Sequence, residues 1–156
     1  MGSRAAKAEE AIEVVTQGYK FLPHTTDAYI EAVGVTFENA LENAGLALFD
    51  TMCNLSSITQ AHQDVIRVKE GDDLEILYDW LETLLLKFEL DQRVYNKFEV
   101  SISKDLRGLR LTANAYGETF DRKKHGAKVE VKAVTYHRME ISRQGNLVAL
   151  RFILDL

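Results

Sequence analysis

The stretch from 72 to 91 constrains the fold most, because apolar side chains cover much of the circumference of the helix that it predicts. The helix is expected to start after Asp72, and Glu75 completes a capping box. Its main apolar stripe comprises Leu74, Leu77, Tyr78, Leu81, Leu85 and Phe88, and its flank adds Ile76, Trp80 and Leu84. A helix with so wide an apolar surface needs cover on two sides. We therefore expect it to lie between a sheet and either the other helix or a second sheet.

The remaining segments supply the partners for this helix. A second helix is predicted over 37–52, with Thr36 as its N-cap. Period-two alternation predicts strands over 19–22, 28–34, 98–103, 109–115, 129–136 and 139–141, and from 147 to the end. The last strand is apolar on both faces, which predicts a central position with cover on both sides. The expected fold class is α+β, with mixed, mostly antiparallel sheets packed with two main helices.

Length and composition limit the function classes. A chain of 156 residues with 46% hydrophobic residues fits one domain, expected over 19–156 after a flexible arm at 1–18. No apolar stretch approaches the roughly 20 residues that span a bilayer, so we expect a cytoplasmic protein without a membrane partner. The net charge of −5 argues against sequence-independent binding to the phosphates of a nucleic acid. The single cysteine, Cys53, is predicted to be a buried, inert thiol.

The end of the chain suggests a metal site. Asp155 stands beside the α-carboxylate of Leu156, directly after the apolar run 152–154. Two ordered carboxylates repel each other unless a cation lies between them. Asp27, with His24 three residues earlier as a possible supporting residue, is the candidate third ligand. Such an all-oxygen site suits calcium, with magnesium or manganese as alternatives, rather than zinc. In the alternative interpretation, Asp27 accepts backbone N–H groups in a turn and His24 is a structural histidine.

A basic run lies between two predicted strands. Arg122, Lys123, Lys124 and His125 stand out in an acidic chain and predict a docking patch for a phosphate or an acidic partner. A solvated loop is the simpler explanation. No aromatic residues are interleaved with the charges, which makes direct RNA binding the weaker option.

Catalytic motifs do not stand out in the sequence. Glu118 and Asp121 could form a carboxylate pair, but a single sequence does not fix their separation. We find no Gly-rich phosphate loop, nucleophile elbow or paired-cysteine motif. The chain is therefore not expected to be an enzyme of these classes.

Several segments together resemble one known family. They are "YKFLPHTTDAYIEAVGVTFENALENAGLALFDTMCN", "ILYDWL", "AYGETFDRKKHGAKVEVKAVTYH" and the terminal "DL". In this order, from Tyr19 to Leu156, the chain resembles the archeases. The resemblance implies a small α+β accessory protein rather than an enzyme. It also implies that the partner is the GTP-dependent RNA ligase that joins tRNA halves in splicing, whose guanylylation and repeated turnover an archease promotes.

The resemblance also implies a ligand set. The metal ligands of the family fall on Asp27, Asp155 and Leu156, the same residues that charge suggested. The family more often has Ala where this chain has Thr26, a change beside the ligand that leaves the carboxylate available. Two other function classes stay open: a metal-dependent hydrolase that uses the same carboxylates with a metal-bound water, and a non-catalytic interaction module.

Overall fold

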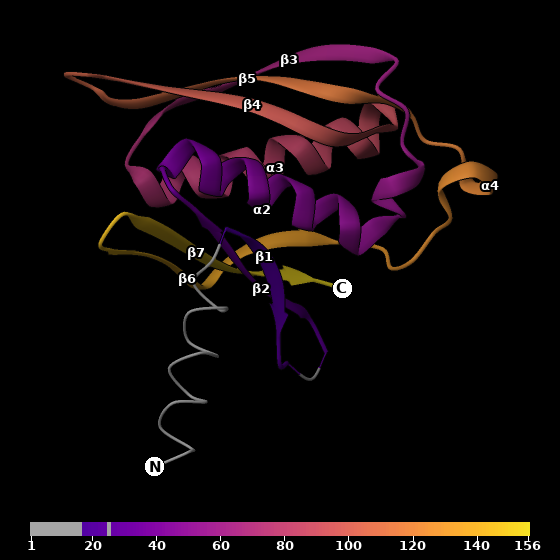
Figure 1. The fold of residues 1–156 in the computed structure, drawn as a ribbon, viewed down its shortest axis with the longest axis horizontal. Helices are drawn as coiled ribbons and strands as arrows, with labels where there is room; N and C mark the ends of the chain where they lie inside the picture. Colours follow the sequence, from indigo (N-terminus) through magenta and orange to yellow (C-terminus); the bar gives the residue numbers. More distant parts are fainter. Residues whose placement is uncertain (1–16, 25) are drawn as a thin grey trace.

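The computed structural model describes residues 17–24 and 26–156, which form two antiparallel sheets and two long helices (Figure 1). The strands are β1 (Gly18–Leu22), β2 (Ala28–Gly34), β3 (His62–Gly71), β4 (Arg93–Asp105), β5 (Gly108–Thr119), β6 (Ala133–Gln144) and β7 (Leu147–Asp155). The helices are α2 (Phe37–Met52), α3 (Asp73–Asp91), the short α4 (Arg122–His125) and a 3-10 turn, η1 (Leu55–Ser57). The predicted α+β class is confirmed. The predicted arm falls almost entirely outside the described residues, and Gly18 already belongs to β1.

The helices lie between the two sheets. One sheet has the strand order β1-β2-β7-β6 and the other β3-β5-β4. Figure 1 shows α2 and α3 as a layer between them, and α3 contacts α2 as well as strands of both sheets. The expectation that this apolar helix is covered on two sides is therefore confirmed. Among the described residues, no helix combines the length and the apolar character needed to cross a membrane.

Local signals set the helix ends. Thr36 Oγ1 accepts the Asn39 N–H at 3.0 Å, as expected of an N-cap. Asp72 and Glu75 form the predicted capping box, because each side chain accepts the backbone N–H of the other. The end of α3 has no such sequence signal. Its C-cap is Gln92, with a φ of 53° in the left-handed region.

The buried face of α3 is centred differently from the prediction. Its buried residues are Ile76, Leu77, Trp80, Leu81, Leu84 and Leu85, so the predicted flank is part of the core. Leu74 was predicted to be buried, but 36% of it is exposed. The reason is that α2 and both sheets cover α3, so the buried surface of the helix is wide and is centred on Trp80 rather than on the predicted stripe. Trp80 Nε1 donates to the Leu41 carbonyl at 2.8 Å and thereby joins the two long helices.

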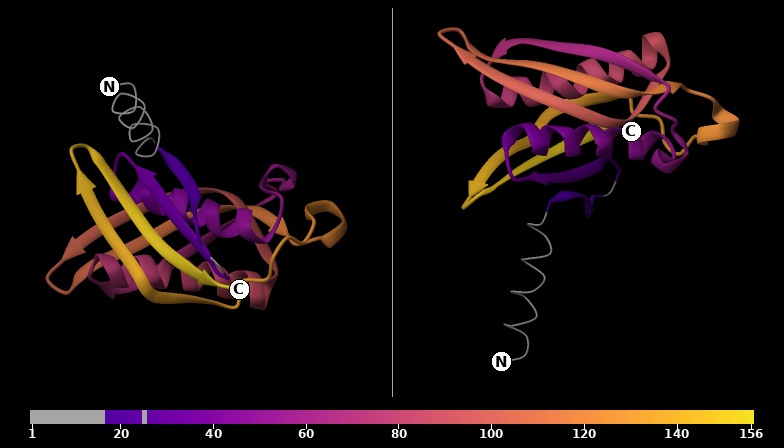
Figure 2. Two further views of the ribbon diagram at one scale, coloured as in Figure 1. Left: turned by 90° about the horizontal axis from the view of Figure 1, so that it is seen from below. Right: turned by 45° about the horizontal axis from the view of Figure 1, so that its top comes forward.

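Three strand predictions need correction. Strand β3 was missed, although Ile66 and Val68 alternate with charged residues in it. The two strands predicted over 129–136 and 139–141 are one strand, β6, which starts only at Ala133. Strand β7 is central, as predicted, but the helices cover only one of its faces. Figure 2, seen from below, shows β6 and β7 in front of the helices. We call this uncovered side the outer face of the four-stranded sheet.

Candidate functional site

The end of the four-stranded sheet brings two of the predicted ligands together. Strands β2 and β7 are antiparallel, and Ala28 pairs with Leu154. Asp27 directly precedes Ala28 and Asp155 directly follows Leu154, so the two residues flank the last pair of this register, although they lie far apart in the sequence. The Asp155 carbonyl accepts the Lys132 N–H at 2.7 Å, which holds the end of β7 in place. We call this end of the sheet, with Asp27, Asp155 and Leu156, the carboxylate tip.

A pocket of about 390 Å³ opens at the carboxylate tip. Asp27 and Leu156 both line it, and Asp50 and Lys128 form part of its wall. Asp50 has partners of its own, because Lys128 Nζ donates to its Oδ1 at 2.9 Å and the Tyr19 hydroxyl donates to its Oδ2 at 3.1 Å. Among the described residues, the carboxylates that line the pocket without a hydrogen-bond partner are therefore Asp27 and the terminal residue. Burial and the neighbouring Asp50 carboxylate raise the pKa of Tyr19, which keeps this hydroxyl a donor.

His24 supports the carboxylate tip only loosely. Its Nδ1 lies 4.0 Å from Asp27 Oδ2, which is too long for a hydrogen bond. The His24 ring instead meets the Tyr29 ring edge-on, with 6.1 Å between the ring centroids. No residue of the described ranges donates a hydrogen bond to the Asp27 carboxylate, whose lone pairs are in that respect open to another ligand.

The donor chemistry of the tip fits a hard cation. The predicted ligands are all oxygens, the set that calcium, magnesium and manganese prefer. Within 17–24 and 26–156, no three His, Cys, Asp or Glu side chains are grouped so that they could hold a metal ion. The third ligand predicted here is the α-carboxylate of Leu156, which is none of these side chains. The metal site therefore stays a prediction.

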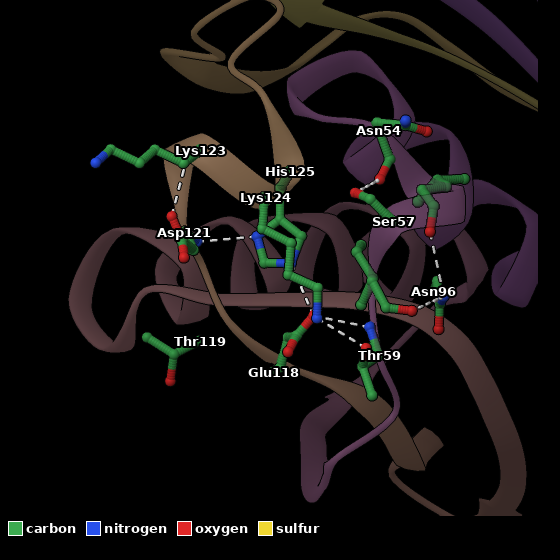
Figure 3. Close-up of polar contacts among 12 residues, drawn as sticks. Asn54, Ser57, Thr59, Asn96, Glu118, Thr119, Asp121, Lys123, Lys124 and His125 are labelled. Carbon is green, nitrogen blue, oxygen red and sulfur yellow. Dashed lines mark hydrogen bonds and ion pairs between the residues drawn. The ribbon is translucent and has the colours of Figure 1, made fainter.

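A second polar cluster lies around α4, the helix that the basic run forms (Figure 3). The side chain of His125 is 0% exposed. Its Nδ1 accepts the Asp121 N–H at 2.9 Å, so in the neutral ring the proton resides on Nε2, which donates to Glu118 Oε2 at 2.8 Å. The same oxygen accepts Lys124 Nζ and the Thr59 N–H, both at 2.7 Å. The Lys124 hydrogen bond, then those of Thr59 and His125, lower the pKa of Glu118 to about 2.

These contacts decide which members of the basic run reach the surface. Arg122 and Lys123 are exposed, and Lys124 is partly tied to Glu118. His125 is buried, so its ring does not take part in a surface patch. The docking prediction therefore concerns Arg122, Lys123 and Lys124, for which it stays a prediction.

The conceivable carboxylate pair of Glu118 and Asp121 has other roles in the structure. Glu118 Oε2 already has three donors. The Asp121 carboxylate accepts the Lys123 N–H at 3.0 Å and caps α4. Both carboxylates therefore serve to hold the α4 segment.

Sequence reasoning missed a row of charges on the outer face of the four-stranded sheet. Lys20, Glu31, Arg151 and Glu140 are successive cross-strand partners with alternating signs. Arg151 Nε donates to Glu31 Oε2 at 2.7 Å, and Lys20 Nζ lies 4.0 Å from Glu31 Oε1. A signal was present, because Glu31 and Arg151 are the charged residues inside two otherwise apolar strands.

The chain is similar to known proteins over most of its length. The family model of the Archease protein family (MTH1598/TM1083) matches residues 19–156. Protein archease of Sulfolobus acidocaldarius is 41% identical over 140 residues, which cover 88% of this chain and 98% of that protein. The chain belongs to the archease family. Protein archease of Pyrococcus furiosus is 44% identical over 121 residues, which cover 77% of this chain and 84% of the relative. The resemblance to archeases that the sequence motifs predicted is thereby confirmed.

Two solved structures support the archease fold. The solution structure of Methanobacterium thermoautotrophicum protein 1598 has a TM-score of 0.79 at 38% identity and covers 90% of this chain and 100% of that chain. A crystal structure of a Thermotoga maritima archease, described as a possible chaperone, has a TM-score of 0.55 at 19% identity. The match covers 88% of this chain and 96% of that one. This second likeness concerns the fold alone.

Proposed function

We propose that this member of the archease family is a metal-binding accessory protein that activates the GTP-dependent tRNA-splicing RNA ligase in the cytoplasm. It promotes guanylylation of the ligase and its multiple turnover, and it is not itself an enzyme. The observation that carries the proposal is that Asp27 and Asp155 flank the last residue pair of β2 and β7, with Leu156 in the same pocket as Asp27. Family membership supports the choice of partner.

The carboxylate tip is the working part in this proposal. Asp27, Asp155 and the α-carboxylate of Leu156 would hold a divalent cation, calcium or alternatively magnesium or manganese. When bound, such a cation neutralises the carboxylates and supplies a Lewis acid. The chain contributes rigid placement, because β2 and β7 are the two inner strands of their sheet and the Lys132 N–H holds the Asp155 carbonyl. A rigid tip loses little conformational entropy when it enters the active-site mouth of a ligase.

The test compares Asp27→Asn and Asp155→Asn with Asp91→Asn, an exposed control at the end of α3. Metal affinity is measured by calorimetry with Ca²⁺ and with Mn²⁺, and ligase guanylylation is measured with radiolabelled GTP. We expect each tip variant to lose at least about tenfold in metal affinity, together with most of the stimulation. The control should match the parent in both. Unchanged stimulation by folded Asp27→Asn protein would refute the proposal.

A chain extended by a few residues after Leu156 tests the terminal ligand separately. The extension displaces the α-carboxylate and leaves both aspartates in place. Loss of metal affinity is expected, and full affinity would remove Leu156 from the ligand set. Turnover of a phosphoester substrate without any ligase would instead favour the hydrolase class.

A further inference from the structure

Strand β6 carries a large bulge close to the carboxylate tip. Thr135 pairs with Ile153 and Glu140 with Arg151, so residues 136–139 stand opposite the single residue Phe152. Arg138, inside this bulge, has a φ of 57°, a left-handed conformation that is rare for a long side chain. Bulges on edge strands often re-aim a side chain beside a functional site. The position of Arg138 therefore calls for an explanation beyond strand pairing.

The bulge directs Arg138 back across the sheet. The Arg138 guanidinium carbon lies 5.9 Å from the centre of the Tyr29 ring. Tyr29 is on β2, and β7 separates β2 from β6 in the sheet. Ile153, the partner of both Tyr29 and Thr135, is only 2% exposed, whereas its outer-face neighbours on β7 are not buried. At the row formed by Tyr29, Ile153 and Thr135, side chains of the sheet itself therefore cover the outer face.

The covered row lies next to the carboxylate tip. Asp155 and Ile153 are two residues apart on β7, and Asp27, the residue before β2, is two residues from Tyr29. Residues two apart point to the same face of a sheet and are separated by about 7 Å. His24 lies near both rows, since its ring meets Tyr29 and its Nδ1 lies 4.0 Å from Asp27 Oδ2. Arg138 therefore stands one row away from the predicted ligands.

Arg138 is also available for binding. It is exposed, and within the described part of the chain it forms no ion pair. Its neighbour on the next row, Arg151, is by contrast held by Glu31 and Glu140. The Tyr29 ring restricts the guanidinium through a cation–π contact, which lowers the entropy lost when a ligand binds.

We infer that Arg138 and the carboxylate tip together bind a polyphosphate group. The inference rests on the proposed function, because phosphate and carboxylate repel each other unless a divalent cation lies between them. Divalent cations bind phosphate oxygens together with protein carboxylates, and the guanidinium fork matches a phosphate. A separation of about 7 Å between the rows favours linked phosphates, which reach both groups, over a single phosphate.

The experiment uses the full chain and the magnesium complex of inorganic triphosphate as the probe. Calorimetry measures its affinity for the parent, for Arg138→Asn, for Arg138→Lys and for Arg107→Ala. Asn tolerates the left-handed backbone, so Arg138→Asn removes the charge without new strain. Arg107, exposed in the turn between β4 and β5, is the matched control for loss of a surface cation.

We expect Arg138→Asn to bind the triphosphate complex at least about tenfold more weakly, Arg138→Lys to lie in between, and Arg107→Ala to match the parent. Parent affinity in Arg138→Asn would overturn the inference. Titration of the metal alone separates this failure from failure of the proposed function. A parent protein that binds no metal refutes both. If the parent binds metal and stimulates the ligase, but Arg138→Asn binds triphosphate as well as the parent does, only the inference is refuted. GTP in place of triphosphate shows whether a base adds affinity, and a guanosine-dependent gain would extend the ligand to a nucleotide.

Discussion

Replacement of Glu118 should destabilise the protein through the buried histidine rather than through the surface lysine. Glu118 Oε2 is the acceptor for His125 Nε2, whose ring is fully buried. In Glu118→Ala this N–H has no acceptor, which costs about 2 kcal/mol. Loss of the hydrogen bond from the Thr59 N–H adds about 1 kcal/mol. The exposed Lys124 pair contributes at most about 0.5 kcal/mol. The expected loss in the free energy of unfolding is therefore about 3 kcal/mol.

Glu118→Gln is expected to lose less, about 1 to 2 kcal/mol, because the carboxamide oxygen can still accept. The pH dependence provides a second test. The pKa of Glu118 is lowered to about 2 in the folded protein, so ionised Glu118 stabilises the fold above the ordinary value of 4.5. This stabilisation is lost as the pH falls from about 4.5 towards 2. The difference between the parent and Glu118→Gln should therefore shrink from pH 7 to pH 3.

Urea denaturation followed by far-UV circular dichroism measures both quantities, at pH 7 and at pH 3. Glu89→Gln, an exposed carboxylate on α3, is the control and should change the free energy of unfolding by less than about 0.5 kcal/mol. If Glu118→Ala unfolds within about 0.5 kcal/mol of the parent at pH 7, the assigned role of the His125 hydrogen bond is wrong. An equal deficit for Glu118→Gln at both pH values would contradict the assigned pKa.

Three further predictions concern the core. Trp80→Phe removes the hydrogen bond to the Leu41 carbonyl and some core volume, and should cost about 2 to 3 kcal/mol in urea denaturation. Gly117→Ala would place a Cβ 1.8 Å from the Val94 carbonyl oxygen, so the pairing of β4 with β5 has to shift, and thermal denaturation should show a loss of about 3 kcal/mol or more. Burial raises the pKa of the Cys53 thiol to about 11, so a thiol reagent at pH 8 should react rapidly only after denaturant is added.

The parts of the fold that could be predicted from sequence are those with local signals. Thr36 and Asp72 cap helices through residues three positions away, so a short window contains the whole interaction. The hairpin of β4 and β5 is equally local, because the turn at 105–108 joins adjacent strands. Such signals do not depend on the rest of the chain.

The bulge in β6 could not be predicted in this way. The segment around Met139 has the alternation of a new strand, and only pairing with β7 shows that 136–139 are extra residues in one strand. The burial of His125 is a similar case. Three cations precede it in the sequence, yet Glu118 and the Phe120 ring, whose centroid lies 5.8 Å from that of the imidazole, hold it inside. The bulge is set by pairing with another strand, and His125 is held by residues five and seven positions away, beyond the three-residue spacing of a helix cap.

The geometry of the carboxylate tip depends on the core of the four-stranded sheet. Ile30 and Phe152 pair across β2 and β7, and both are 0% exposed beneath the helices. A slip of either strand by one residue would turn these side chains outward and turn Asp27 or Asp155 towards the core. Burial of an unpaired carboxylate costs several kcal/mol, as does exposure of two large apolar side chains, so both terms oppose the slip. The packing that stabilises the sheet therefore also fixes the register that ends at Ala28 and Leu154, beside Asp27 and Asp155.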